Sequence, residues 1–129
     1  MHATGSFEVK VTPEQSSDPA FARMSLDKQF HGALQGVSKG EMLAFGTGAK
    51  GSSGGYVALE QFTGTLDGRS GSFVLQHNTT MTRGVPQMSI AVVPDSGTGD
   101  LTGISGTMKI IIQDGKHSYD FEYVLPESK

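Results

Sequence analysis

Apolar residues recur at every second position along nearly the whole chain, and this alternation constrains the fold more than any other feature. Near the N-terminus, Phe7, Val9 and Val11 alternate with Glu8 and Lys10, and similar runs follow up to the C-terminal segment. Successive side chains of a β-strand point to opposite faces, so a period of two indicates strands with one buried face. The pattern therefore predicts an all-β chain.

The composition agrees with short strands joined by tight turns. Eighteen of the 129 residues are Gly, which is unfavourable inside helices but useful in turns and bends. Gln35-Gly36, Asp67-Gly68 and Asp114-Gly115 are predicted hairpin turns, because Gly tolerates the positive φ of primed turns. Two prolines limit residues 13–22 to one short helical turn. We expect eight strands, near residues 4–12, 23–34, 37–46, 55–66, 69–81, 87–93, 104–113 and 116–125.

The phrase Phe-x-Gly-x-Leu-x-Gly-x-Ser occurs twice, beginning at Phe30 and at Phe62. Each copy is read as the end of one strand, a two-residue turn and the start of the next strand. Counting back from the turns, the first hairpin would pair Phe30 with Glu41, and the second would pair Phe62 with Phe73. Both phenylalanines are expected on the inner face.

Eight antiparallel strands with one apolar face each must close or stack to hide that face. Closure into a barrel also removes the exposed edges. The sequence therefore predicts one domain over residues 1–129, an eight-stranded antiparallel β-barrel, with a two-sheet sandwich as the alternative. The interior of such a barrel is filled by side chains or holds one small ligand.

Charge and composition exclude several classes of function. The net charge of −3 gives no electrostatic reason to expect a nucleic-acid partner. The chain has no Cys, so it forms no disulfides and has no thiolate chemistry. No apolar run is near the roughly 18 residues of a membrane span, so no membrane partner is predicted. The N-terminus MHATGSFEVK lacks the basic and apolar regions of a signal peptide. We expect a cytoplasmic protein, unless a leader was removed.

Three segments carry a resemblance to a known family: FHGALQG at 30–36, YVALEQFTGTLDGRSGSFVLQH at 56–77 and VVPDSGTGDLTG at 92–103. They resemble a family of small uncharacterised bacterial proteins that carries only a domain-of-unknown-function label. Structures of that family are similar to the allene oxide cyclase barrel, so the resemblance implies an allene oxide cyclase-like, eight-stranded barrel. It implies no activity, and no motif here carries the catalytic residues of allene oxide cyclase across.

Two polar residues on the predicted inner face are the candidate catalytic pair. Glu60 lies between Ala58 and Phe62, and His77 is expected opposite Ala58 or Glu60. A buried Glu would have a raised pKa suited to acid–base work, with His77 as its partner. The alternative is that these groups lie at a solvated barrel mouth, ion-paired with lysines.

No metal or cofactor is predicted. Glu41 is placed inward by the predicted pairing, and with Glu60 and His77 it could form a facial triad, but the local spacing of a cupin-type metal site is absent. The Gly-x-Gly-x-x-Gly string at 46–51 is followed by a strand rather than a helix. It is therefore read as a loop and not as a dinucleotide site.

Three functions remain open from the sequence. The first is binding of a small apolar or amphipathic molecule inside the barrel. The second is a lyase, isomerase or cyclase that uses Glu60 and His77, and the third is a structural subunit with a filled barrel. The residues expected to bind the ligand are Glu41, Phe30, Tyr56, Phe62, Phe73, Met108, Tyr119 and Phe121.

An apolar patch is predicted on the outer face of the third to fifth strands. It comprises Met42, Ala44, Val57, Leu59 and Val74, which lie on consecutive strands. A contiguous apolar patch on a protein surface usually contacts something, and most oligomers are symmetric homo-oligomers. We expect a dimer or trimer through this face, unless the N-terminal arm or residues 13–22 fold back over it within one chain.

Overall fold

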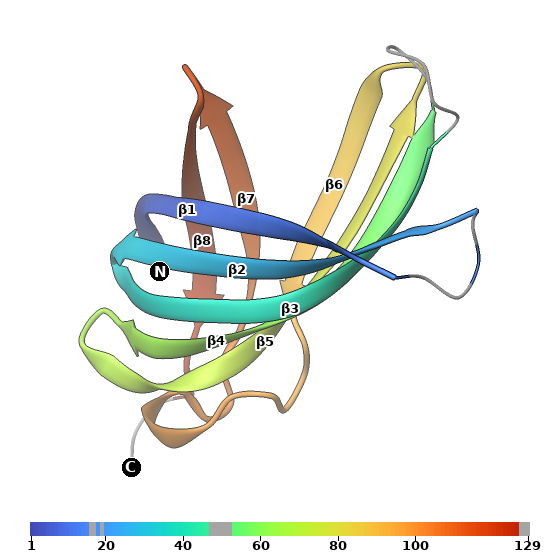
Figure 1. Cartoon of the computed structure of the whole chain (residues 1–129). Helices are drawn as coiled ribbons and strands as arrows, with labels where there is room; N and C mark the ends of the chain where they lie inside the picture. Colours follow the sequence, from blue (N-terminus) through green and yellow to red (C-terminus); the bar gives the residue numbers. More distant parts are fainter. Residues whose placement is uncertain (16–17, 19, 47–52, 127–129) are drawn as a thin grey trace.

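A computed structural model describes residues 1–15, 18, 20–46 and 53–126 of the chain. Its eight antiparallel strands each pair with the next, and β8 pairs with β1 to close a barrel (Figure 1). The predicted barrel is confirmed and the sandwich is excluded. The strands are β1 (His2–Glu14), β2 (Ala22–Gly32), β3 (Leu34–Gly46), β4 (Gly54–Leu66), β5 (Arg69–Thr82), β6 (Val85–Val92), β7 (Ser105–Gln113) and β8 (Lys116–Val124).

Among the described residues, little helix accompanies the strands. The described residues include a 3-10 turn, Gly99–Leu101, which was not predicted. The expected helical turn over 13–22 does not form at its ends, because Pro13 and Glu14 belong to β1 and Ala22 begins β2. Within the described ranges, no helix is both long enough and apolar enough to cross a bilayer. The Gly-rich string at 46–51 lies, apart from Gly46, outside the described residues.

Two of the predicted turns form as expected. Asp67 and Gly68 have φ values of 48° and 83°, and Asp114 and Gly115 have 54° and 76°. Both residues of each turn are thus in the left-handed region, as a primed turn requires. The second hairpin pairs Phe62 with Phe73, as predicted from the sequence. A further turn of this kind, Arg83-Gly84, was not predicted.

The first copy of the repeated phrase folds differently from the second. Gln35 and Gly36 lie inside β3, and the chain bends at Ala33 instead. The phenol of Tyr119 holds this bend, because its hydroxyl accepts a hydrogen bond from the Leu34 amide at 2.9 Å and donates one to the His31 carbonyl at 2.8 Å. The predicted turn at Gln35-Gly36 is therefore wrong.

The two copies also differ in the residue that precedes the second Gly. The second copy has Asp67 where the first has Gln35. Asp enters the left-handed region more readily than most residues, and the Asp67 carboxylate also accepts a hydrogen bond from the Tyr123 hydroxyl. Gln lacks that preference, so nothing at Gln35 opposes the bend that Tyr119 holds at Ala33.

The shifted bend changes which face of β3 is buried. Phe30 pairs with Gly36 rather than with Glu41. The shift is an odd number of residues, and such a shift moves every side chain of a strand to the other face. Met42 and Ala44 therefore face inward, contrary to the prediction, and Glu41 faces outward.

One end of the barrel is filled by aromatic rings. Phe62 packs against Phe30 and Phe73, with ring centroids 5.6 Å and 5.2 Å apart, and Phe121 stacks on Phe73. The loop that follows β6 covers this end and contributes Leu101, which is fully buried. We call this half the closed end. Its buried residues are Phe7, Phe30, Leu34, Phe62, Leu66, Phe73, Leu75, Leu101, Ile104, Met108, Tyr119, Phe121 and Tyr123.

The other end of the barrel is less complete. Between β6 and β7 the ladder consists of one pair, Ala91 with Thr107, and the ribbons of these strands diverge toward the top of Figure 1. Apolar side chains of the inner face remain partly exposed there, including Met81 at 40% and Met88 at 45%. We call this region the open mouth, defined by Met24, Met42, Tyr56, Met81 and Met88.

Candidate functional site

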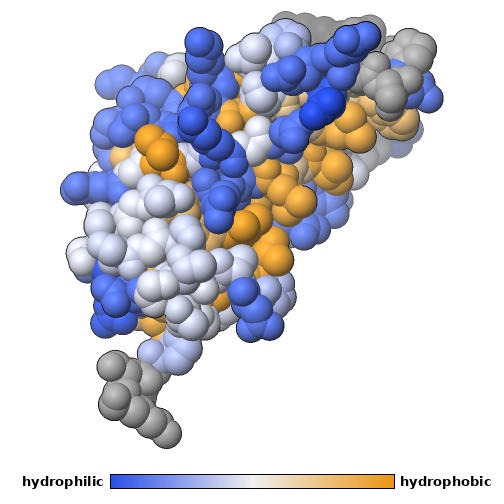
Figure 2. All heavy atoms as spheres, turned by 60° about the horizontal axis from the view of Figure 1, so that its bottom comes forward, coloured by the Kyte–Doolittle hydropathy of each residue, from blue (hydrophilic) through white to orange (hydrophobic). Residues whose placement is uncertain are grey.

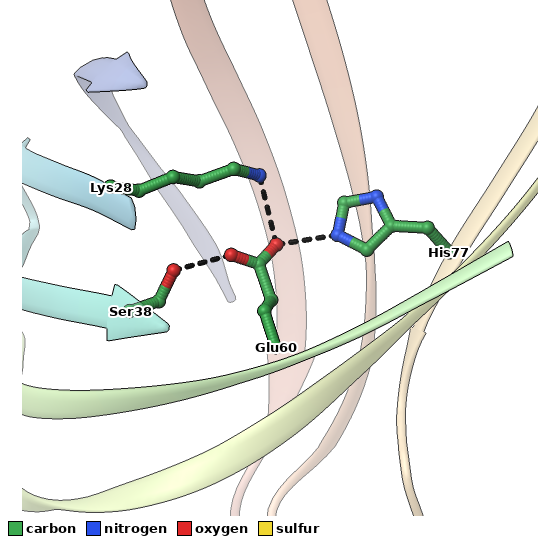
Figure 3. A network of polar contacts seen from close by, with 4 residues as sticks. All are labelled: Lys28, Ser38, Glu60 and His77. Carbon is green, nitrogen blue, oxygen red and sulfur yellow. Dashed lines mark hydrogen bonds and ion pairs between the residues drawn. The ribbon is translucent and has the colours of Figure 1, made fainter. Parts of the chain in front are cut away.

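Four polar side chains meet at the boundary between the closed end and the open mouth. Glu60 of β4 accepts hydrogen bonds from the Lys28 Nζ at 2.9 Å and from the His77 Nε2 at 2.5 Å, both at Oε1. Its other carboxylate oxygen, Oε2, accepts a hydrogen bond from the Ser38 hydroxyl. Figure 3 shows the three side chains converging on this carboxylate. Lys28, Ser38, Glu60 and His77 form what we call the polar cluster, and all four are buried.

Strand register brings these residues together. Lys28 pairs with Ser38 across β2 and β3, and His77 pairs with Ala58, two positions before Glu60. Gly40 lies directly opposite Glu60 on β3. A Cβ on Gly40 would come within 2.8 Å of the Glu60 Cβ, so this position accepts no side chain without a shift.

The electrostatic state of Glu60 differs from the prediction. Burial raises the pKa of the carboxyl group, but the hydrogen bond from His77, the positive charge of Lys28 and the hydrogen bond from Ser38 outweigh burial and lower the pKa to about 2. The expected raised pKa is wrong, because Glu60 forms the ion pair with a lysine that the sequence offered as the alternative, and because Ser38 faces inward beside it. At neutral pH Glu60 is a carboxylate that orients His77 and does not donate a proton.

A second hydroxyl group lies one step further along the inner face of β5. Thr79 follows His77 by two residues, so both side chains point inward. Thr79 is 6% exposed, and its Oγ1 meets no hydrogen-bond partner within the part of the chain that the structure describes. An unsatisfied buried hydroxyl is uncommon in native proteins and calls for a physical explanation.

The predicted catalytic pair is brought together, and the predicted Glu41 is not part of it. Glu60 and His77 are in hydrogen-bonding contact, as expected, although their role in catalysis stays a prediction. Glu41 lies on the outer face, where it accepts a hydrogen bond from the Arg23 Nε at 2.8 Å. The facial triad is therefore not assembled, and no group of three or more His, Asp or Glu residues suited to a metal ion occurs among the described residues.

The residues predicted to bind a ligand divide into two groups. Tyr56 is half-buried at the open mouth, where a ligand could reach it. The other aromatic residues and Met108 are buried and belong to the packed core of the closed end: Phe30, Phe62, Phe73, Met108, Tyr119 and Phe121.

Sequence reasoning missed Ser38, Thr79 and three methionines of the mouth, Met42, Met81 and Met88. The alternation along β5 places Thr79 on the same face as His77, and this signal was present in the sequence. Ser38 and Met42 could not be found in this way, because the wrong bend before β3 reversed the face of the whole strand.

The outer face of β3, β4 and β5 is hollowed. Apolar side chains gather in a strip on the face seen in Figure 2. A groove of about 740 Å³ there is lined by Leu43, Val57 and Leu59, with Arg23, Glu41 and Gln76 among its polar residues. Val57 and Leu59 are 53% and 54% exposed, as predicted.

The predicted outer patch is corrected at β3. Met42 and Ala44 face inward and are replaced on the outer face by Leu43 and Phe45. The ring of Phe21, from the segment between β1 and β2, lies 6.3 Å from the ring of Phe45. This segment therefore reaches one end of the strip, and the Val57 and Leu59 region is left exposed.

Comparisons with known proteins agree with the fold. A crystal structure of a protein from Shewanella oneidensis MR-1, described as a protein with unknown function from the DUF3224 family, is 47% identical in sequence and superposes with a TM-score of 0.93. The similarity covers 99% of this chain and 98% of that chain. No curated protein matched the chain. The model of the DUF3224 family, described as a protein of unknown function, matches residues 3–123. The chain therefore belongs to the DUF3224 family.

Proposed function

We propose that this protein binds a small apolar or amphipathic molecule in the open mouth of its barrel. The apolar part of the ligand packs against the methionines and Tyr56, and its polar part faces the polar cluster. The observation that carries the proposal is the position of partly exposed apolar side chains on the inner face, next to a buried polar cluster. Ligand sites commonly combine an apolar lining with a few polar groups that fix orientation.

The chemistry of the mouth suits a ligand of this kind. Four of its five defining residues are methionines, at positions 24, 42, 81 and 88. Met side chains are unbranched and polarisable, so they adapt to apolar molecules of different shape. The single ladder pair between β6 and β7 leaves this end of the barrel less constrained than the closed end.

An enzymatic role is the second candidate, favoured by the hydrogen bond between Glu60 and His77. A lyase, isomerase or cyclase acting on a lipid-like substrate would use His77 as the base and Glu60 to hold its imidazole in place. The expected likeness of the barrel to allene oxide cyclase supports this second candidate.

Cytoplasmic location also remains a prediction from the sequence.

A fluorescence titration with N-phenyl-1-naphthylamine, a neutral apolar probe, tests the binding proposal. We expect saturable binding of one probe per chain. Met88→Lys should weaken binding at least about tenfold, because it places a charge in the apolar mouth. Val57→Lys is the matched control on the outer groove and should leave the affinity unchanged.

Two results would contradict the proposal. Absence of saturable binding would support the third candidate, a structural protein with a filled barrel. Loss of binding in Val57→Lys but not in Met88→Lys would place the ligand in the outer groove instead of the mouth.

A further inference from the structure

Two polar atoms on the inner face of β5 have no hydrogen-bond partner among the residues that the structure describes. His77 uses Nε2 to contact Glu60, and none of the described residues forms a hydrogen bond with its Nδ1. In Figure 3 the second ring nitrogen points away from the Glu60 carboxylate. The Thr79 Oγ1 is the other atom, and it is buried without a partner in the described part of the chain.

The hydrogen bond to Glu60 defines which ring nitrogen of His77 acts as the donor. Lys28 and Glu60 form a buried ion pair, with side chains 7% and 0% exposed. They neutralise one another, and an ionised carboxylate can only accept a hydrogen bond, so the proton in the contact between His77 and Glu60 lies on the His77 Nε2. The neutral ring has one N–H, and donation from Nε2 to the Glu60 carboxylate leaves a lone pair on Nδ1.

Thr79 complements this acceptor. Residues two positions apart on a strand share a face, with Cα atoms about 7 Å apart. A group lying between His77 and Thr79 would meet a lone pair at Nδ1 and a hydroxyl that rotates freely to donate. A hydroxyl group satisfies both, because one O–H donates while its oxygen accepts.

We propose that the polar head of the ligand is a neutral hydroxyl, an alcohol or phenol, which donates to the His77 Nδ1 and accepts from the Thr79 hydroxyl. This inference rests on the proposed function, since it names the ligand class of the same site. A carboxylate head would place its negative charge against the lone pair of the His77 Nδ1 and near the negative charge of Glu60. An ammonium head would add a second cation close to Lys28. Each ion would also lose its hydration without a balancing charge.

Displacement of N-phenyl-1-naphthylamine by three probes with the same alkyl chain tests the inference. The probes are 1-decanol, decanoate and decylammonium, at pH 7.5. We expect 1-decanol to bind about tenfold or more tightly than either ion. Thr79→Val keeps the shape of the side chain and removes its hydroxyl, so it should weaken 1-decanol about fivefold to tenfold, as expected for one hydrogen bond. Thr80→Val, on the exposed outer face of β5, should change nothing.

Nitrogen-15 NMR of the histidine ring provides a readout that is independent of affinity. In the free protein, His77 should show the neutral form with the proton on Nε2. Addition of 1-decanol should shift the Nδ1 resonance toward that of a hydrogen-bonded acceptor, while leaving Nε2 protonated. This measurement keeps the inference testable even where a variant is too unstable to titrate.

The outcomes separate the two proposals. Saturable naphthylamine binding with equal displacement by all three probes, or no effect of Thr79→Val on 1-decanol, overturns the hydroxyl inference and leaves the binding function in place. A protonated His77 Nδ1 in the free protein also overturns the inference. Absence of naphthylamine binding and of any shift with 1-decanol overturns both.

Discussion

The two ends of this barrel are built from the same strands but differ in how completely they are packed. At the closed end, Phe62, Phe73 and Phe121 are fully buried, and their rings contact one another in series. At the open mouth, Met81 and Met88 remain 40% and 45% exposed. The comparison indicates that the closed end supplies most of the stability, while the mouth keeps apolar surface accessible.

The reason for the difference lies in how the ends are joined. At the closed end, Tyr119 ties β8 to the bend between β2 and β3, and the loop after β6 inserts Leu101 and Ile104. β6 and β7 share one ladder pair, Ala91 with Thr107, which adjoins Met108 of the closed end, and Met88 at the mouth has no ladder partner on β7 among the described residues. The polar cluster marks the boundary, so its effect on stability should fall between those of the two ends.

The largest effect is expected at the closed end. Phe62→Ala should lower the free energy of unfolding by about 3–5 kcal/mol, because it removes a fully buried ring and leaves a cavity. Met88→Ala is the matched change at the mouth and should lower it by less than about 1 kcal/mol. Urea unfolding measures both. Equal losses would remove the distinction between the two ends.

Removal of one charge from the polar cluster should give a somewhat smaller loss. Glu60→Gln leaves Lys28 buried without a counter-ion, so the free energy of unfolding should fall by about 3 kcal/mol. The double variant Glu60→Gln with Lys28→Met removes both charges and should recover part of this loss. If the double variant is no more stable than Glu60→Gln alone, the ion pair is not the cause.

Acid should gradually remove the stabilising contribution of the ionised Glu60. The pKa of Glu60 is lowered from 4.5 to about 2 in the folded protein, so its stabilising effect is complete above about pH 4.5 and is lost as the pH falls toward 2. The slope attributable to Glu60 between these values is about 1.4 kcal/mol per pH unit. Comparison of urea unfolding for the native protein and Glu60→Gln across this range isolates it. Parallel pH curves would contradict the lowered pKa.

The smallest effect on stability is expected on the outer face. Self-association through Val57 and Leu59 stays a prediction. Leu59→Lys should change the free energy of unfolding by less than about 0.5 kcal/mol, since Leu59 is 54% exposed. In light scattering it should nevertheless convert a dimer or trimer into a monomer, whereas Gln61→Lys on the same face should not. A monomeric native protein at high concentration would refute the prediction.

Much of the fold could be predicted from local sequence. The alternation of apolar residues located all eight strands, and the Asp-Gly turns defined the registers of the β4–β5 and β7–β8 hairpins. Because Glu60 and His77 belong to one such hairpin, their shared inner face was predictable. These features depend on residues close together in the sequence, where backbone preference and side-chain period act directly.

The sequence by itself thus determined the strands, two hairpin registers and the shared face of Glu60 and His77. The tertiary structure decided the face of β3, because the bend before it is held by Tyr119, a residue 85 positions from Leu34. That bend turned Glu41 outward and Ser38 inward. The tertiary structure also decided the pKa of Glu60, since Lys28 and Ser38 reach the carboxylate from two other strands. Neither outcome follows from local pattern, because both depend on contacts between strands that form only when the barrel closes.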